Sequence, residues 1–216
     1  LQARGLEVLV YGVPAYSTVG WTEWLGGDPL LSTFIRWPEG ELARLVFHEL
    51  AHQVVYAEGD TTFNESFATA VERIGVQRWL AANGSAEAKQ QYAALDARRE
   101  EFRALTGRYR DRLEALYAGP AEEAAKRQAK AALMAELRGE YARVKAERWG
   151  GFAGYDGWFE RANNASFGVL AAYNELVPAF ERLFERQGGD FTRFYAEVGR
   201  LASLPKAQRH ATLRAN

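Results

Sequence analysis

Cysteine is absent from the 216-residue chain, which excludes disulfide bonds and thiolate metal sites. Its absence does not indicate a redox compartment. Histidine is almost as scarce, with three copies in the whole sequence. A metal centre in this protein must therefore combine very few imidazoles with carboxylate oxygens.

An excess of charge of one sign is also missing. Lysine and arginine total 27, aspartate and glutamate total 28, and the net charge is −1. We therefore expect no nucleic-acid partner, because such a partner favours a basic surface. No apolar run reaches the roughly 18 residues of a membrane span, so we expect no membrane contact by this fragment itself. The opening "LQARGLEVLVYG" is typical of the middle of a fold, which leaves open whether a natural N-terminal segment precedes it.

Hydrophobic residues make up 48% of the chain, which is enough for a sizeable core. Short apolar runs at 6–11 and 30–37 predict two strands, and hence a small N-terminal sheet, although Asp28-Pro29 could instead open a short helix at the second run. Apolar residues at helical spacing then predict helices over 39–56 and about 61–82. The first third of the chain is therefore expected to mix a small sheet with two helices.

The motif "HELAH" places His48 and His52 four residues apart in the first of these predicted helices. Residues four apart stand one turn above each other on one face, so both imidazoles can point at one ion. Zinc accepts neutral imidazole nitrogen at about 2.0–2.1 Å. Glu49 lies beside the two histidines, where it can activate a zinc-bound water by taking its proton. This H-E-x-x-H arrangement is typical of metallopeptidases.

Catalytic zinc usually has three protein ligands, and the remaining histidine, His210, lies in the terminal tail. Because cysteine is absent, we expect the third ligand to be a carboxylate. The stretch "NESFA" supplies Glu65 on the next predicted helix, which would return across the first and bring this carboxylate to the histidines. Thr61 or Thr62 can cap that helix, and Thr62 and Glu65 have the spacing of a capping box.

Longer stretches carry a resemblance to a known family. They are "GVPAYSTVGW", "DPLLST", "FHELAHQVVYAEGDTTFNESFATAVERIGVQRWL", and "NNA" before "YNELVPAFERLF". With them the chain resembles the bacterial family of predicted aminopeptidases, which are gluzincin-type zinc metallopeptidases, over nearly its whole length. The resemblance implies Zn²⁺ on His48, His52 and Glu65, Glu49 as the base, and a peptide substrate. Family members often begin with a lipoprotein signal, which implies a periplasmic or lipoprotein-anchored location in a bacterium.

The fold expected from these patterns is α+β and predominantly α, in three parts. Residues 1–84 form a zincin-like part with the sheet and the metal-binding helix pair. Residues 85–149, rich in Ala, Glu, Lys, Arg and Gln, form a long αα-hairpin insertion. Residues 150–216 form C-terminal helices that complete the catalytic domain, and the polar residues from about 206 are expected to fray.

The oxyanion of peptide hydrolysis needs a donor besides zinc, and tyrosine is the expected source because histidine is so scarce. Tyr173 is the first candidate and Tyr16 the second. Glu72 lies seven residues after Glu65, on the same helix face, and is expected to accept a hydrogen bond from a ligand histidine or from a substrate group. Asn64 is a further polar candidate for the substrate cleft.

Two alternatives to an aminopeptidase stay open. Better-known gluzincin aminopeptidases carry a G-x-M-E-N stretch that helps to bind the free α-amine, whereas the corresponding upstream region here is "GVPAYSTVG". A zinc endopeptidase therefore fits the sequence as well. In the other alternative, the predicted hairpin is the working surface of a scaffold protein with a vestigial metal site, and it binds a protein partner or forms a homodimer.

Overall fold

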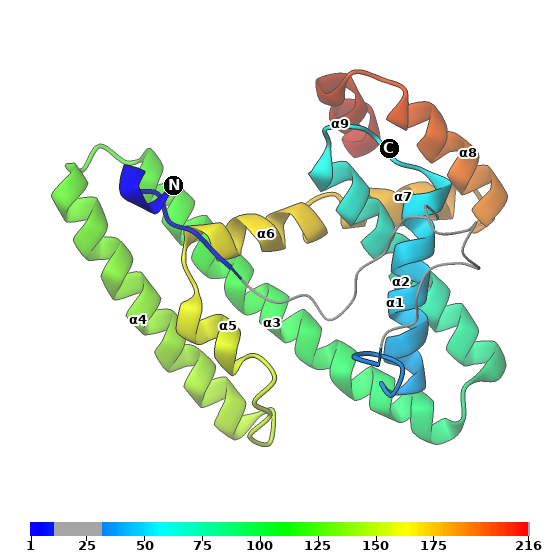
Figure 1. Ribbon diagram of the computed structural model, residues 1–216, viewed down its shortest axis with the longest axis horizontal. Coiled ribbons are helices and arrows are strands. Elements are labelled where there is room, and N and C mark those ends of the chain that lie inside the picture. The colour runs from blue at the N-terminus through cyan, green and yellow to red at the C-terminus, as the bar shows by residue number, and fades with distance from the viewer. Residues whose placement is uncertain (11–31, 216) are drawn as a thin grey trace. The chain divides into compact units, whose positions relative to one another are not determined.

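The chain folds into helices joined by short connections in a computed structural model that describes residues 1–10 and 32–215 (Figure 1). A 3-10 turn, Gln2–Arg4, lies near the start of the chain. The helices are α1 (Glu39–Val54), α2 (Thr61–Asn83), α3 (Ala86–Ala118), α4 (Glu123–Glu147), α5 (Asp156–Arg161), α6 (Asn164–Asn174), α7 (Val177–Arg186), α8 (Phe191–Ala202) and α9 (Lys206–Ala215). Among these, none is long and apolar enough to cross a membrane.

The predicted N-terminal sheet is wrong, although the predominance of helix is confirmed: within the described ranges there is no strand. Residues 32–37 form a turn, in which the backbone N–H of Trp37 donates to the carbonyl of Phe34 at 2.9 Å. Leu6 and Val10 of the other run are 49% and 82% exposed. An apolar run becomes a strand only when a second strand pairs with its backbone groups, and among residues 1–10 and 32–215 neither run has such a partner.

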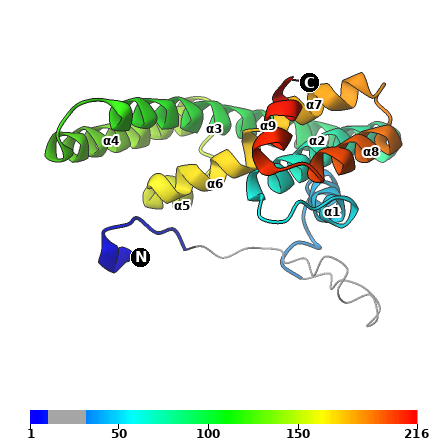
Figure 2. The same ribbon diagram turned by 90° about the horizontal axis from the view of Figure 1, so that it is seen from above.

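Helices α1 and α2 form an antiparallel pair that holds the H-E-x-x-H motif, and they lie side by side in both ribbon views (Figure 2). Their contact is close at Gly75 of α2, where a Cβ atom would lie 3.0 Å from the ring of Phe47. Glycine therefore lets the ring of α1 rest directly on the backbone of α2. This packing fixes the distance between the motif on α1 and the carboxylates of α2.

The start of α2 differs from the predicted capping box. Asp60 is the N-cap, and its Oδ1 accepts the backbone N–H of Phe63 at 3.3 Å. Neither Thr61 nor Thr62 is the capping residue, because the helix begins one residue after Asp60. The carboxylate of Glu65 is thereby left to face the histidines of α1.

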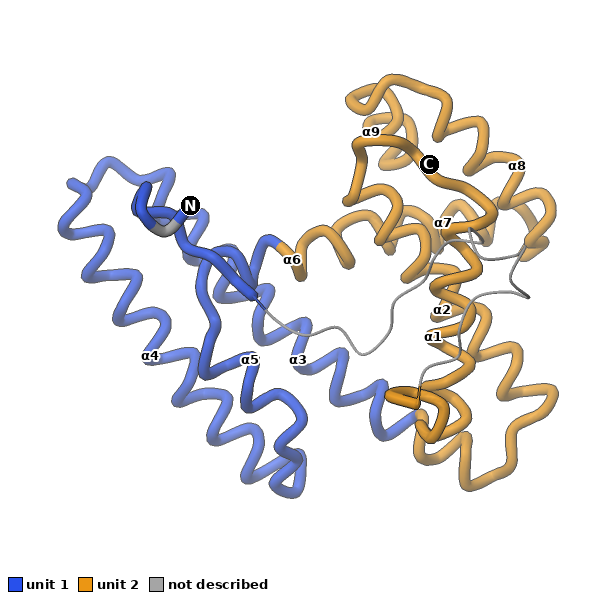
Figure 3. Tube along the Cα trace, viewed as in Figure 1, with its two compact units in different colours: residues 1–10, 93–168 blue, residues 11–92, 169–216 orange. Residues whose placement is uncertain are grey.

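The chain divides into two compact units, and each is described by itself (Figure 3). One unit comprises residues 11–92 and 169–216, and it contains the whole H-E-x-x-H region. Its main core is aromatic and aliphatic, and it joins α2 to α7, α8 and α9. The largest fully buried members of this core are Phe63, Phe67, Phe180, Phe194, Leu176, Leu183, Leu201 and Leu213.

The other unit comprises residues 1–10 and 93–168 and is built on the two long helices α3 and α4. They run antiparallel: Arg112, near the end of α3, pairs with Glu136 in the middle of α4 at 2.7 Å, whereas Glu101, in the middle of α3, pairs with Arg148 just after α4 at 2.7 Å. The ring of Tyr141 stacks on Phe159 at a centroid distance of 3.8 Å. Charged residues thus line the outer parts of the helix pair, and aromatic rings fill its interior with α5.

Candidate metal centre

Three metal-binding side chains meet where α1 lies against α2. His48 and His52 are one turn apart on α1, and their Nε2 atoms are 3.3 Å from each other. Oε2 of Glu65, on α2, lies 3.3 Å from His48 Nε2 and 3.8 Å from His52 Nε2. His48 is buried and the other two residues are partly buried. The described part of the chain therefore contains a group that could hold a metal ion.

The spacing of these atoms agrees with a tetrahedral ion. Two donor atoms at 2.0–2.1 Å from a tetrahedral zinc ion lie about 3.3–3.4 Å from each other. Two of the three measured separations are 3.3 Å, and the third is 3.8 Å. In addition, Oε2 of Glu65 is buried, and apart from its ion pairs with the two histidines it makes no hydrogen bond of good geometry. A buried carboxylate oxygen needs a partner, and a cation between the three atoms would provide one.

The pKa shifts of His48, His52 and Glu65 indicate that the cluster favours a positive charge between its side chains. Burial lowers the pKa of His48, but the hydrogen bonds and negative charges of Glu65 and Glu72 outweigh it and raise this pKa to about 9. Burial and the charge of His48 lower the pKa of His52. Burial raises the pKa of Glu65, and the two histidines and a hydrogen bond with Tyr173 lower it overall. The carboxylates of Glu65 and Glu72 thus stabilise the protonated form of His48. A metal ion could replace the proton on Nε2, the nitrogen that faces Glu65.

Glu72 contacts His48 at Nδ1, the ring nitrogen that does not face Glu65, and also forms an ion pair with Arg44. Glu72 Oε2 is 2.9 Å from His48 Nδ1, and Glu72 Oε1 accepts a hydrogen bond from Nη2 of Arg44. Burial raises the pKa of Glu72, but the charge of Arg44 and the contact with His48 outweigh it, so this pKa is lowered overall. The ionised Glu72 accepts a hydrogen bond from the Nδ1–H of His48, so that Nε2 faces Glu65.

The other site residues expected from the sequence lie in different places. Glu49 follows His48 on α1 and is partly buried. The ring of Tyr173, 36% exposed, stacks on the His48 ring at 6.0 Å. Asn64 turns its side chain to the turn before α2, where it bonds to the carbonyl of Ala57 at 2.9 Å and to its N–H at 2.8 Å. Tyr16 lies outside the described residues.

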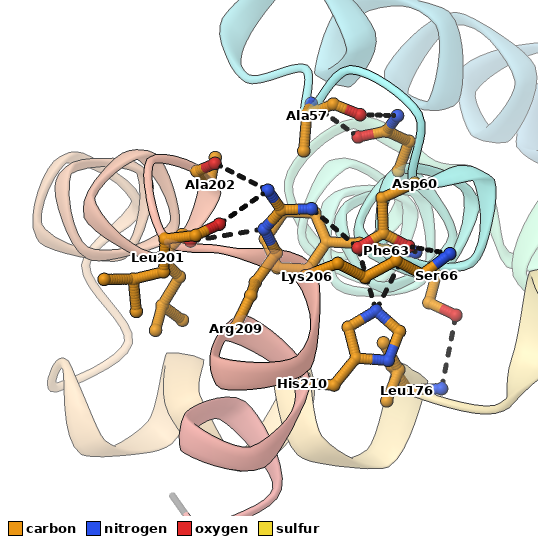
Figure 4. Close-up of polar contacts among 12 residues, drawn as sticks. Ala57, Asp60, Phe63, Ser66, Leu176, Leu201, Ala202, Lys206, Arg209 and His210 are labelled. Atoms are coloured by element: carbon orange, nitrogen blue, oxygen red, sulfur yellow. Dashed lines mark hydrogen bonds and ion pairs between the residues drawn. The ribbon is translucent and has the colours of Figure 1, made fainter.

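A buried ionic network fixes the turn between α1 and α2 (Figure 4). Asp60, 1% exposed, lies 2.6 Å from Nη1 of Arg209 and 2.8 Å from Nε2 of His210, both on α9. Lys206 Nζ is a third basic group near this carboxylate, 3.6 Å from Asp60. Arg209 also donates to backbone carbonyls, two of which are those of Ala202 at 2.8 Å and Leu204 at 2.9 Å. The C-terminal residues therefore hold the start of the helix that carries Glu65.

This network corrects the expectation that the residues from about 206 fray. They form α9, in which Arg209 is 6% exposed and Leu213 is fully buried. The polar composition of the segment conceals this role, because the partner of Arg209 is Asp60, 149 positions away. Sequence reasoning also missed Arg44, although its position one turn before His48 was a usable signal.

The Asp60 network gives a prediction for acid stability. Burial raises the pKa of Asp60, but the hydrogen bonds of His210 and Arg209 outweigh it and lower this pKa below its usual range. A carboxyl whose pKa is lowered on folding stabilises the protein at higher pH and loses that contribution as pH falls through the folded-state pKa. We expect the difference in unfolding free energy between wild type and Asp60→Asn to shrink as pH falls below about 4. Urea unfolding at several pH values measures it, and a difference that stays constant down to the acid limit would contradict the prediction.

Comparison with protein families supplies the remaining observation. Residues 1–213 match the family described as "Putative aminopeptidase". No match was found among curated proteins or among solved structures. Because the match extends over nearly the entire sequence, the chain belongs to this aminopeptidase family.

Proposed function

We propose that the protein is a gluzincin-type zinc peptidase that acts as an aminopeptidase, with the ion on His48, His52 and Glu65. The single observation that carries the proposal is the convergence of these three side chains at separations of 3.3, 3.3 and 3.8 Å. Two imidazoles and a carboxylate are the donor set of the thermolysin-like catalytic zinc sites, which keep a fourth position open. The family to which the chain belongs supports a peptide as substrate.

Bound zinc would supply Lewis-acid chemistry, polarising a carbonyl and making water a stronger acid. The residues of the chain provide the rest. Glu49 is next to His48 on α1, where its carboxylate accepts a proton from the attacking water and passes it to the leaving amine. Glu72 holds His48 in one tautomer through Nδ1. The hydroxyl of Tyr173 donates a hydrogen bond to the oxyanion of the substrate.

Tyr173→Phe should lower kcat for peptide hydrolysis by about 10²-fold, which is the loss typical for one oxyanion donor. Its ring would still stack on His48, so the variant should bind as much zinc as wild type. Tyr56→Phe is the matched control, because Tyr56 is also near a ligand histidine, with its ring 6.4 Å from that of His52, but is 64% exposed. Steady-state kinetics and zinc analysis of both variants make the test. Full activity in Tyr173→Phe with normal zinc content would remove the hydroxyl from the mechanism.

The choice between exopeptidase and endopeptidase depends on the substrate's N-terminus. Membership of the family supports an aminopeptidase, whereas the absence of a G-x-M-E-N stretch from the sequence leaves a zinc endopeptidase as the alternative. An aminopeptidase must hold a free α-amine, so blocking that amine should abolish cleavage. An endopeptidase would cleave blocked and free peptides alike.

The experiment that tests the proposal combines zinc analysis with a peptide library. Purified protein should bind one equivalent of zinc, lose activity with a chelator and recover it when zinc is added back. Peptides with free and with acetylated N-termini are then compared by mass spectrometry, and cleavage of the free peptides alone is expected. Zinc binding without cleavage of any peptide would contradict the proposal and favour the scaffold alternative.

A further inference from the structure

Arg44, Glu72 and His48 form a continuous chain of contacts at the metal centre. Arg44 and His48 are four residues apart on α1, so their side chains lie on the same face of the helix, one turn apart. Glu72 reaches both of them from α2: its Oε1 accepts from Arg44, and its Oε2 lies 2.9 Å from His48 Nδ1. The two oxygens of one carboxylate are thus shared between a guanidinium and an imidazole.

Because each oxygen of the Glu72 carboxylate has its own partner, the carboxylate is restricted in its motion. Glu72 is 3% exposed, so water cannot replace a lost partner on either oxygen. With Oε1 held by Arg44, the carboxylate cannot rotate about its terminal bond without leaving a buried oxygen unpaired, which is costly. The Oε2 atom is therefore kept in the plane and at the distance that His48 Nδ1 requires. The Nε2 atom of His48 is in turn kept directed at His52 and Glu65.

We propose that Arg44 is a positioning residue of the metal centre, which acts on His48 through Glu72 and so raises the affinity of the three-residue site for zinc. The inference rests on the proposed function, because it assumes that the site binds zinc. Groups behind a histidine ligand typically change metal affinity or activity by 10–100-fold. Arg44 is one contact further from the ion, and the effect of its removal is therefore expected at the lower limit, about tenfold.

Zinc affinity, measured by competition with a chromophoric chelator, tests the proposal. Arg44→Met keeps the length of the aliphatic chain and removes the charge, and it should raise the Kd for zinc about tenfold. Arg44→Lys keeps the charge but loses the fork of donors, and its Kd should fall between those of Arg44→Met and wild type. The visible spectrum of bound Co²⁺ should shift in Arg44→Met, because His48 is less firmly oriented.

Arg73→Met is the matched control. Arg73 lies on α2 with a similar side-chain exposure, 25% against 29% for Arg44, but it forms an ion pair with Glu181, at 3.2 Å, instead of with Glu72. This variant should bind zinc like wild type. A second control compares Glu72→Gln alone with the double variant Arg44→Met and Glu72→Gln. Because Arg44 acts through Glu72, the double variant should bind zinc no more weakly than Glu72→Gln alone.

The outcomes separate the inference from the proposed function. Wild-type zinc affinity in Arg44→Met and Arg44→Lys, with tight zinc binding by the parent protein, would overturn the role of Arg44 alone. An equal loss in Arg73→Met, or a further loss in the double variant, would also overturn it, since the effect would then not pass through Glu72. A parent protein that binds no zinc would refute the proposed function and this inference with it.

Discussion

Replacing Glu49 with glutamine is expected to lower kcat/KM for peptide hydrolysis about 10³-fold while the protein still binds zinc. A carboxylate can accept a proton from water, whereas the amide of glutamine cannot, although the two side chains have nearly the same shape. The expected ligands His48, His52 and Glu65 are untouched by this change, so the metal content should stay at one equivalent. Steady-state kinetics on a peptide with a free N-terminus, together with zinc analysis of the same sample, make the measurement.

Glu58→Gln provides the control for this experiment. Glu58 is an exposed glutamate in the turn between α1 and α2, and the same chemical change there should leave kcat/KM within about twofold of wild type, as for most surface positions. Glu49→Gln with undiminished activity would exclude Glu49 as the base and leave the proposed mechanism without a proton acceptor. Loss of zinc in that variant would instead indicate that Glu49 helps to hold the site together.

The candidate metal site could be predicted from the sequence because its residues lie close together along the chain. His48 and His52 are related by the period of one helix, and Glu65 lies on the next helix after a short turn. Helical spacing and a reversal of the chain are enough to predict that these residues converge. The same reasoning placed Glu72 on the face of Glu65, where the structure has it in contact with His48.

The parts that could not be predicted depend on distant partners. An apolar run such as residues 6–10 has the same local pattern whether or not a second strand pairs with it, so the sheet was predicted where none is found among the described residues. Arg209 gives the opposite case. Its surroundings in the sequence are polar, yet it is 6% exposed because Asp60 and several carbonyls receive its donors. In both cases the local sequence pattern does not show whether a distant partner is present.

The same distant pairing leads to the largest expected effect on stability. Asp60→Ala should lower the unfolding free energy by about 3–5 kcal/mol, the usual cost of removing one partner from a buried ion pair. The change leaves Arg209 charged and buried without a carboxylate, and it also removes the N-cap of α2 at Phe63. Urea unfolding followed by circular dichroism measures the loss. Glu197→Gln is the control, because Arg200 and Glu197 form a pair on α8 in which the Arg200 side chain is 53% exposed, and exposed pairs contribute at most about 1 kcal/mol.

The double variant Asp60→Ala with Arg209→Met tells whether the loss comes from the unpaired charge. When both partners are replaced, no guanidinium remains buried without a carboxylate, so the double variant should be more stable than the sum of the single losses predicts, by about 2 kcal/mol. Additive losses would mean that the residues act separately, Asp60 as a cap and Arg209 through the carbonyls of Ala202 and Leu204. A coupled result would establish that Arg209 of α9 stabilises the beginning of α2, one turn before Glu65, through its ion pair with Asp60.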